Sequence, residues 1–429
     1  MKRYVLYHLL MIALIGSLAA CTMRKPEDVK GYKIRLSFGP GEETKIAEAF
    51  LSIKDSTSIF LKAGKYRFDN LSIAQVSHIK IEGAGPDKTI LDFSAQSQGG
   101  EGLRVTDVKG FTIAGMTLKD SKGDLIKINK SEKVFVSYVH AVWSVSDSTT
   151  GGYAIYPVMC KNVLIENCYA QGASDAGIYV GQTDSAIVRY CKAYKNVAGC
   201  EIENTSHAEV YKNEFYGNTA GFLIFDLPDL SQRGGHVKAY NNDIHENNER
   251  NFAKAGSFGS TWGVGNAAPG SGVVILSASD IELYNNNIFN NNSCAISVVS
   301  GFFIDPNAAA KMNDHYDPIP KDIVIHNNVM IMADTFPSAV YEHHTGKILV
   351  AIAKQLKVQD PSRNKSNLPF IIYDGITSNV LTHKTGPNPD NLCIKEQEED
   401  LFVNADALRM QTKKWRPYTD VRPFLCNQL

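Results

Sequence analysis

The chain has 429 residues, a net charge of −1 and 44% hydrophobic residues. This balance lacks the basic footprint of nucleic-acid-binding proteins, so we expect no nucleic-acid partner. The length alone would suggest about three domains of roughly 150 residues. Internal repeats override that estimate, because each repeat of a solenoid packs only against its neighbours. We therefore expect one elongated, monomeric body.

The first 20 residues are typical of an export signal. A positively charged start precedes an apolar run over residues 5–18, which is too short to span a membrane as a stop-transfer helix. The run ends in Leu-Ala-Ala-Cys at Cys21, which resembles the lipobox of bacterial lipoproteins and implies lipidation of Cys21. The alternative is an ordinary secretory signal cleaved near Ala20. With residues 21–32 as a tether, we expect a lipid anchor in the bacterial cell envelope, at the outer membrane and facing the periplasm or the outside.

Short elements then follow in order. Residues 33–38 alternate apolar and polar side chains and predict a strand, and residues 42–54 predict an amphipathic helix that caps the first coil of a solenoid. Strand-like runs over residues 59–66, 71–73 and 79–83 come next, with glycines at the turns. These runs resemble the first coils of the pectate-lyase-like right-handed β-helix superfamily. The resemblance implies an all-β chain folded as a right-handed parallel β-helix.

A sequence cycle of 22 to 23 residues recurs through the middle of the chain and indicates one solenoid coil per cycle. Its starting residues are Asn162, Ser185, His207, His236, Asp280 and Asp322, and the last three spacings lengthen to 29, 44 and 42 residues. Six positions after each start, one slot holds Cys168, Cys191, Asn213, Asn242, Asn286 and Asn328. Asparagine tolerates left-handed turn conformations and can bond to copies of itself above and below, so we expect a stacked ladder in a turn.

The cycle becomes hard to follow towards the C-terminus. We predict the β-helix, with its N-terminal helical cap, over residues 33–335 and an irregular C-terminal cap and tail over residues 336–429. Besides Cys21 the chain has seven cysteines, so at least one thiol is free. Cys393 and Cys426 flank the tail and either form a disulfide or remain free thiols.

Alternation along the strand over residues 199–204 gives the direction of its side chains. Cys200 and Ile202 are predicted to face the core, and Glu201 and Glu203 to face solvent. Coils stack at about 4.8 Å, so outward residues of neighbouring coils should form one strip. That strip is predicted to contain Tyr156, Tyr179, Gln182, Glu201, Glu203 and Asp226.

Paired carboxylates beside aromatic rings suit sugar chemistry, because a carboxyl supplies an acid or base and a ring stacks on a sugar face. The predicted catalytic groups are Glu201, Glu203 and Asp226. The predicted substrate-binding groups are Tyr156, Tyr179, Gln182, Asn204, Arg250 and Trp262, the last two from a long loop over residues 245–271. The alternative for each carboxylate is a solvated strand residue. We expect no cofactor and no metal ligand set, with calcium as the one ion left open.

The central cycles resemble most closely a family of exported bacterial parallel β-helix repeat proteins, through residues 177–182, 196–204 and 225–230. That resemblance implies the fold and no particular activity. The Asp-Pro-His-Asp run of alginate C5-epimerases has its nearest match in Asp226-Leu-Pro-Asp229, which lacks the histidine. Two functions stay open: a lyase or C5-epimerase acting on acidic polysaccharide, and a non-catalytic module that binds a glycan or a protein along the same face.

Overall fold

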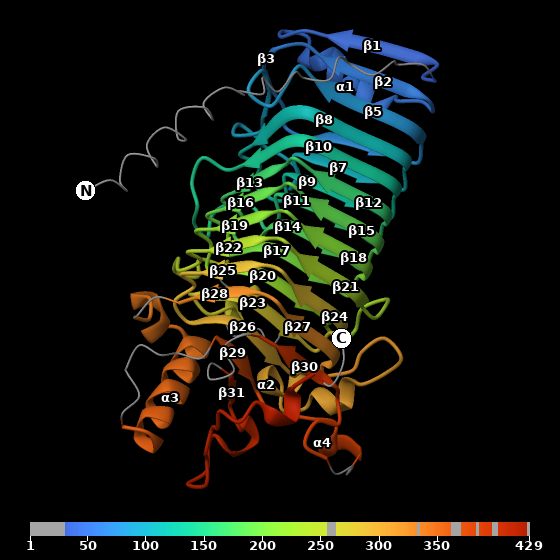
Figure 1. The fold of residues 1–429 in the computed structure, drawn as a ribbon. Coiled ribbons are helices and arrows are strands. Elements are labelled where there is room, and N and C mark those ends of the chain that lie inside the picture. The colour runs from blue at the N-terminus through green and yellow to red at the C-terminus, as the bar shows by residue number, and fades with distance from the viewer. Residues whose placement is uncertain are drawn as a thin grey trace, which may run out of the picture.

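The computed structural model describes residues 31–254, 263–332, 335–361, 370–382, 386–396 and 402–426. Its named strands pair in parallel and wind into one stack of coils, blue at the N-terminal end and red at the C-terminal end (Figure 1). A regular coil contributes one strand to each of three faces and returns to the first face one strand further along the stack. The chain is therefore the parallel β-helix that its sequence predicts.

The first face of the stack is a row of parallel strands. Its members are β1 (Ile34–Phe38), β2 (Thr57–Leu61), β5 (Ser77–Gly83), β8 (Lys109–Lys119), β10 (Glu132–Val142), β12 (Lys161–Glu166), β15 (Asp184–Arg189), β18 (Ser206–Tyr211), β21 (Gly235–Tyr240), β24 (Ser279–Tyr284), β27 (Lys321–His326) and β30 (Leu392–Lys395).

The second face joins the first because β8 and β10 are long enough to pair on both. Its own strands are β3 (Gly64–Arg67), β6 (Thr89–Asp92), β13 (Tyr169–Gln171), β16 (Lys192–Tyr194), β19 (Glu214–Tyr216), β22 (Asp243–His245), β25 (Asn287–Phe289) and β28 (Val329–Ile331).

The third face is a separate sheet. Its strands are β4 (Leu71–Ala74), β7 (Leu103–Thr106), β9 (Ile126–Asn129), β11 (Ile155–Val158), β14 (Ala176–Gly181), β17 (Ala198–Glu203), β20 (Ala220–Phe225), β23 (Ser271–Leu276), β26 (Cys294–Val299), β29 (Ile371–Tyr373) and β31 (Phe402–Asn404). With β30 on the first face, β29 and β31 carry both sheets past residue 335, where we expected the cap to begin.

The core lies between the three faces, where equivalent side chains of successive coils stack. Ile178, Cys200 and Phe222 pair in register on the third face and are fully buried. The predicted inward direction of Cys200 and Ile202 is thus confirmed. This stacking gives the core its continuity, because every coil buries its apolar side chains against the coils on either side.

The predicted ladder occupies the turn between the first and second faces. Asn213 Nδ2 donates to Asn242 Oδ1 (3.0 Å), and Asn242 Nδ2 donates to Asn286 Oδ1 (2.9 Å). Asn286 continues to Asn328 and Asn328 to Glu396, each at 2.8 Å. The left-handed conformation belongs to the residue before each slot, as at Asn241 with φ 54°. The asparagines in the slot itself contribute the hydrogen bonds between coils.

A second asparagine ladder, which we did not predict, lies in the turn between the second and third faces. Asn196 Nδ2 donates to Asn218 Oδ1 (3.0 Å), Asn218 to Asn247 (2.9 Å) and Asn247 to Asn291 (2.9 Å). Each Oδ1 also accepts the backbone N–H of the preceding ladder residue, as Asn218 does from Asn196 (2.9 Å). The two ladders satisfy buried polar groups in turns that the strands leave unpaired.

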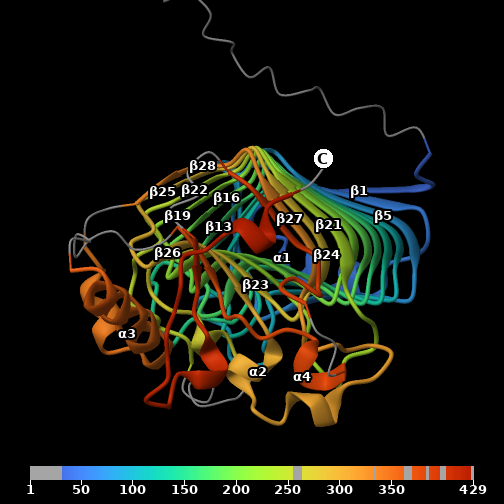
Figure 2. The same ribbon diagram turned by 60° about the horizontal axis from the view of Figure 1, so that its bottom comes forward.

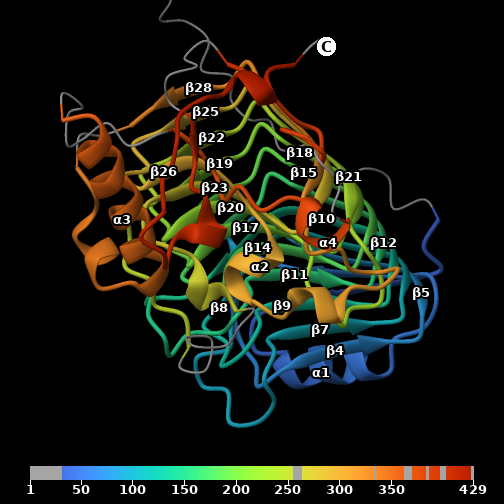
Figure 3. The ribbon, with the colours of Figure 1, turned by 90° about the horizontal axis from the view of Figure 1, so that it is seen from below.

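Helices lie at the two ends of the stack. Near the N-terminal end, α1 (Glu43–Leu51) buries Ile46 and Phe50, as expected for a cap. At the other end lie α2 (Gly301–Ile304), α4 (Asn379–Thr382) and α3 (His344–Gln359), which stands to one side of the stack (Figures 2 and 3). Within the described residues, no helix has the length and apolar character that crossing a membrane requires.

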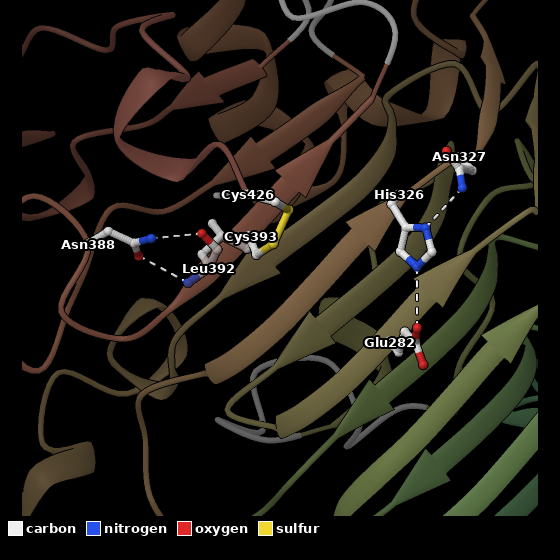
Figure 4. Close-up of a disulfide and its surroundings, with 7 residues drawn as sticks. All are labelled: Glu282, His326, Asn327, Asn388, Leu392, Cys393 and Cys426. Carbon is white, nitrogen blue, oxygen red and sulfur yellow. Dashed lines mark hydrogen bonds and ion pairs between the residues drawn. A yellow bond between two sulfur atoms is a disulfide. The ribbon is translucent and has the colours of Figure 1, made fainter. Parts of the chain in front are cut away.

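Cys393 in β30 and Cys426 form a disulfide, so the first of the two predicted alternatives is confirmed (Figure 4). Asn388 closes the turn before β30, because it donates to the carbonyl of Leu392 (2.8 Å) and accepts its N–H (3.0 Å). The disulfide therefore ties the C-terminal tail to the last strand of the first face. The described free cysteines are Cys160, Cys168, Cys191, Cys200 and Cys294, all buried.

Candidate active site

A row of outward side chains runs along the third face. Tyr179 in β14 pairs in register with Glu201 in β17, which pairs with Leu223 in β20. Glu203, Phe225 and Leu276 form a parallel row two residues further along these strands. The structure thus places Tyr179, Glu201 and Glu203 side by side on the third face.

The predicted exposure of this strip is wrong. Glu201 is 2% exposed and Glu203 is 9% exposed, because other parts of the chain cover the third face. Alternation in a strand tells whether a side chain leaves the coil, and it does not tell what lies outside the coil. Here the cover consists of residues 263–268 and α3, which pack on this face and, together with the strands, line a partly open cavity of about 530 Å³.

Two histidines at the start of α3 hold these covering segments together. His343 Nε2 donates to the carbonyl oxygen of Gly265 (2.9 Å), and His344 Nε2 lies 2.7 Å from Asn266 Oδ1. Burial lowers the pKa of His343 to about 4, so its imidazole is neutral at physiological pH. The cavity wall thus combines a loop from the middle of the chain with a helix from its C-terminal part.

Three carboxyl groups lie at one end of the cavity: Asp175, Glu201 and Glu203. The Tyr179 hydroxyl donates to Glu203 Oε2 at 2.5 Å. Glu201 Oε1 is buried and has no hydrogen-bond partner among the described residues. Leaving a buried carboxyl oxygen without a partner is costly, so such a group indicates a site that a ligand completes.

The surroundings of the three carboxyls favour their protonated forms. Burial raises the pKa of Glu201 well above its usual value, and the charges of Asp175 and Glu203 raise it further. Burial also raises the pKa of Glu203, against the hydrogen bond from Tyr179. For Asp175, burial and the charge of Glu203 raise the pKa to about 8. The cluster therefore retains protons at neutral pH, because neighbouring carboxyls in a buried site cannot all ionise.

Aromatic rings surround the carboxyl cluster. The Tyr153 ring lies 4.4 Å from that of Tyr156 and 4.7 Å from that of Tyr179, between centroids. Lys127 Nζ lies 4.8 Å from the centroid of the Tyr156 ring. Burial raises the pKa of Tyr179 and Tyr153 well above the usual value, so both hydroxyls stay protonated and act as donors. Tyr153 lines the cavity itself.

Three predicted site residues support a neighbouring loop. Asp226 accepts the Gly234 N–H on both carboxyl oxygens (3.1 Å each). Asn204 Nδ2 donates to the carbonyl of Gln232 (2.8 Å), and Gln182 Oε1 accepts the Ser231 hydroxyl (2.8 Å). These contacts fold the segment after β20 onto the edge of the stack, and none of the three predicted residues lines the cavity. Catalysis by Asp226, and binding by Asn204 and Gln182, stay predictions.

Of the remaining predicted residues, only Arg250 lies within the described part of the chain. Arg250 is exposed and pairs with Glu342, outside the cavity lining. Trp262 and Cys21 lie outside the described residues. Within the described part of the chain, no group of three His, Cys, Asp or Glu side chains could hold a metal ion.

Asp175 and Tyr153 were missed because neither stands on a regular strand. Asp175 directly precedes β14, in a position where the next two coils have Val197 and Thr219. A single carboxylate among apolar and hydroxyl residues was the available signal. Tyr153 precedes β11 at the end of an irregular turn, and no repeat position identified it.

Comparison with known proteins agrees with this architecture. The family model described as "Right handed beta helix region" matches residues 57–226 and 140–308. None of the curated proteins matches the chain. Among solved structures, the A-module of the mannuronan C-5 epimerase AlgE4 from Azotobacter vinelandii is 14% identical, with a TM-score of 0.52 over 82% of this chain and 89% of that one.

Two further structures are more distant. The A-module of the mannuronan C-5 epimerase AlgE6 from Azotobacter vinelandii is 14% identical, with a TM-score of 0.45 over 68% of this chain and 82% of that one. DFA-IIIase from Arthrobacter chlorophenolicus A6 is 11% identical, with a TM-score of 0.42 over 68% and 79%. At these identities the likeness shows the fold alone.

Proposed function

This chain belongs to the right-handed β-helix family, and we propose that it is a carbohydrate-active enzyme with Glu201 as general acid and Glu203 as base or nucleophile. The observation that carries the proposal is the contrast between these two carboxyls, which stand two residues apart on β17. Burial raises the pKa of both, but the Tyr179 hydroxyl that donates to Glu203 opposes the rise there, whereas Glu201 has a free Oε1 and neighbouring charges that raise its pKa further. Pairs of carboxyls in unequal surroundings are how enzymes divide acid and base roles.

Cleavage of a glycosidic bond is the reaction that this pair fits best. Two carboxyls that flank the bond are what most glycoside hydrolases use, with one protonated and one ionised. The α-carbons of residues i and i+2 in a strand lie roughly 7 Å apart, so two such side chains on one face can reach the two sides of a glycosidic bond. The described residues that line the cavity include no Lys or Arg that could neutralise an acidic sugar. This favours a neutral sugar as the substrate.

Lyase or C5-epimerase action on an acidic polysaccharide is the second candidate, and the Tyr179–Glu203 pair favours it, because a carboxylate and a tyrosine hydroxyl can serve as base and acid. Proton removal at C5 of a uronate needs a base, and return of the proton needs an acid on the other face of the ring. A protonated Glu201 would then donate a hydrogen bond to the uronate carboxylate. This hydrogen bond would take the place of a cation that neutralises the carboxylate. The same cavity also fits the remaining alternative, a non-catalytic glycan-binding module.

The deciding experiment separates these three functions by product. Protein lacking residues 1–21 is incubated with neutral oligosaccharides and, separately, with alginate and pectate. Reducing-end release reports hydrolysis, absorbance of unsaturated uronate reports lyase action, and proton NMR reports epimerisation. We expect Glu203→Gln to lower the rate about 10²- to 10⁴-fold.

Glu209→Gln is the matched control. The Tyr240 hydroxyl donates to Glu209 Oε2 at 2.8 Å, so this pair repeats the chemistry of Tyr179 and Glu203 on an exposed part of the first face. Its rate should equal that of the unchanged protein. If no product forms from any of these carbohydrates while calorimetry still detects their binding, the enzyme proposal fails and the binding module replaces it.

We also propose that the chain is exported and lipid-anchored through Cys21. The Leu-Ala-Ala-Cys run supports this, and residues 1–30 lie outside the described residues. Expression in a bacterial host with labelled palmitate tests it. Label should enter the membrane fraction with the protein and disappear in Cys21→Ala. Label in both forms, or in neither, would contradict the anchor.

A further inference from the structure

The cavity changes character along the axis of the stack. At β17 the outward residues are Glu201 and Glu203, and at β20 and β23 the same two rows are apolar. On β26 the first row ends in Ser297 and the second in Val299. One end of the cavity is therefore acidic and the rest of its strand wall is mainly aliphatic.

The part of the lining that α3 contributes is also apolar. Ile348, Leu349 and Ile352 of α3 line the cavity. Asp374 also lines it, but its carboxyl is already satisfied by the Ser300 N–H and hydroxyl (2.7 Å each) and by the Ile376 N–H (2.9 Å). The other polar side chains of the lining beyond the carboxyl end all have hydrogen bonds within the described part of the chain except Thr345; they are Asn266, Ser271, Ser297, His344 and Thr345. The rest of this part of the lining is apolar.

Such a wall is a poor environment for further sugar units. A sugar carries hydroxyls around its ring, and each one that is buried without a partner costs free energy. A saturated hydrocarbon chain has no polar groups to satisfy and gains free energy from leaving water. From β20 to β26 the stack advances by two coils, or roughly 10 Å, which gives the apolar part the length of a chain of about seven or eight carbons.

We infer that the substrate is an amphipathic glycoconjugate, with a sugar at Glu201 and Glu203 and a linked hydrocarbon chain that extends between β20–β26 and α3. This inference rests on the proposed function for the sugar end alone. The apolar end is a binding property, and it can be measured whether or not the protein turns over its ligand. The cover over the third face then has a second task, because it builds the apolar wall that an open sheet lacks.

The experiment measures calorimetric affinity for n-alkyl glucosides with two to ten carbons, each below its critical micelle concentration. Burial of one methylene is worth enough for about a fourfold gain in affinity. We expect that gain at each added carbon until the chain reaches the end of the cavity. An affinity that does not depend on chain length would overturn the inference.

Two variants locate the chain. Val274→Thr places a hydroxyl against the chain and should weaken octyl glucoside binding about tenfold while leaving ethyl glucoside unchanged. Val299→Phe fills the far end, so the gain per carbon should stop at a shorter chain than in the unchanged protein. Val324→Thr is the matched control, because Val324 points outward on the first face, in register with Glu282.

The outcomes separate the two proposals. A chain-length series that Val274→Thr and Val299→Phe alter, together with no turnover of any carbohydrate, upholds the amphipathic ligand and refutes the enzyme. Turnover of sugars with a flat chain-length series upholds the enzyme and refutes the amphipathic substrate. Equal losses in Val274→Thr and Val324→Thr would show that the chain binds elsewhere, and the inference would fall.

Discussion

Two glutamate–tyrosine pairs stand close in sequence on different faces of the stack. On the third face, Tyr179 donates to Glu203 at 2.5 Å, and Glu203 is 9% exposed. On the first face, Tyr240 donates to Glu209 at 2.8 Å, and Glu209 is exposed. The same two residue types thus form the same hydrogen bond in a buried and in an open setting.

The difference between the two pairs comes from what covers them. Because the coils repeat, outward residues at equal or neighbouring positions of adjacent coils lie within contact distance on every face. Only the third face is covered by residues 263–268 and α3, and burial there raises the pKa of Glu203. The coil therefore supplies proximity, and the cover supplies the dry surroundings in which carboxyls differ in proton affinity.

The largest expected effect is on the pH dependence of stability. The pKa of Asp175 is about 8 in the folded chain, so the folded state holds a proton that the unfolded state releases near pH 4. The stabilising contribution of the Asp175 proton is then complete below about pH 4 and is lost as the pH rises to about 8. Asp175→Asn should reduce this pH-dependent loss in the free energy of unfolding. The reduction should be at most roughly 5 kcal/mol, because Asp175 keeps some exposure to the cavity.

Asp92 on the second face supplies the opposite case. Burial raises its pKa, but hydrogen bonds from Lys65 and Ser94 outweigh burial and lower the pKa to about 2. Asp92 therefore stabilises the fold above about pH 4, and that contribution is lost as the pH falls towards 2. Urea unfolding from pH 2 to pH 9 checks both. Parallel curves for Asp175→Asn and the unchanged protein between pH 4 and 8 would contradict the buried cluster.

The next largest effect concerns the disulfide that attaches the C-terminal tail to the stack. Cys393 and Cys426 are 33 residues apart, and closing a loop of that length stabilises by about 3–4 kcal/mol in the chain-entropy model. The tail inside this loop includes Ala405, which lines the cavity. Reductant should lower the melting temperature of the unchanged protein and leave that of Cys426→Ser unaltered. An equal response of the two proteins would show that the tail is held without the disulfide.

A smaller loss is expected in the asparagine ladder that supports both faces. Asn218→Ala removes the bond to Asn247 and leaves the Asn196 side chain and N–H without their acceptor. Each buried group left unpaired costs about 1–3 kcal/mol, with partial relaxation, so we expect a loss of about 2–3 kcal/mol. Asn287→Ala, which removes an exposed bond to Asp243, should cost less than about 0.5 kcal/mol. Equal losses in urea unfolding would contradict a structural ladder.

The sequence predicts what repeats. The slot at Asn213, Asn242 and Asn286 predicted a ladder correctly, because equal positions of stacked coils must touch. The second ladder at Asn196 and Asn218 was equally periodic and could have been found by the same count. Inward and outward directions on β17 followed from alternation in the same way.

Features that occur only once in the chain could not be predicted from its repeats. The cavity that Glu201 lines is also lined by His344 and Ile348, more than 140 residues further along the chain, and no period links them to β17. Burial of Glu201 therefore depends on tertiary packing, and only the structure distinguishes it from the solvated Glu209. Asp175 was missed for a related reason, because its role depends on its distance to Glu201 and Glu203 and not on a repeat position.

The smallest change in stability is the one that separates stability from function. Glu201 is buried with an unpartnered Oε1, whereas the next coil has Leu223 at the same register. Glu201→Leu should therefore raise the free energy of unfolding at pH 7 by about 1–2 kcal/mol, because it replaces an unsatisfied carboxyl by a side chain that the neighbouring coil already accommodates. Activity should be lost in the same variant. Glu209→Leu on the open face should change stability by less than about 0.5 kcal/mol. A destabilised Glu201→Leu would mean that the carboxyl has a stabilising partner in solution, and the contrast between the covered and the open pair would then no longer indicate a site that a ligand completes.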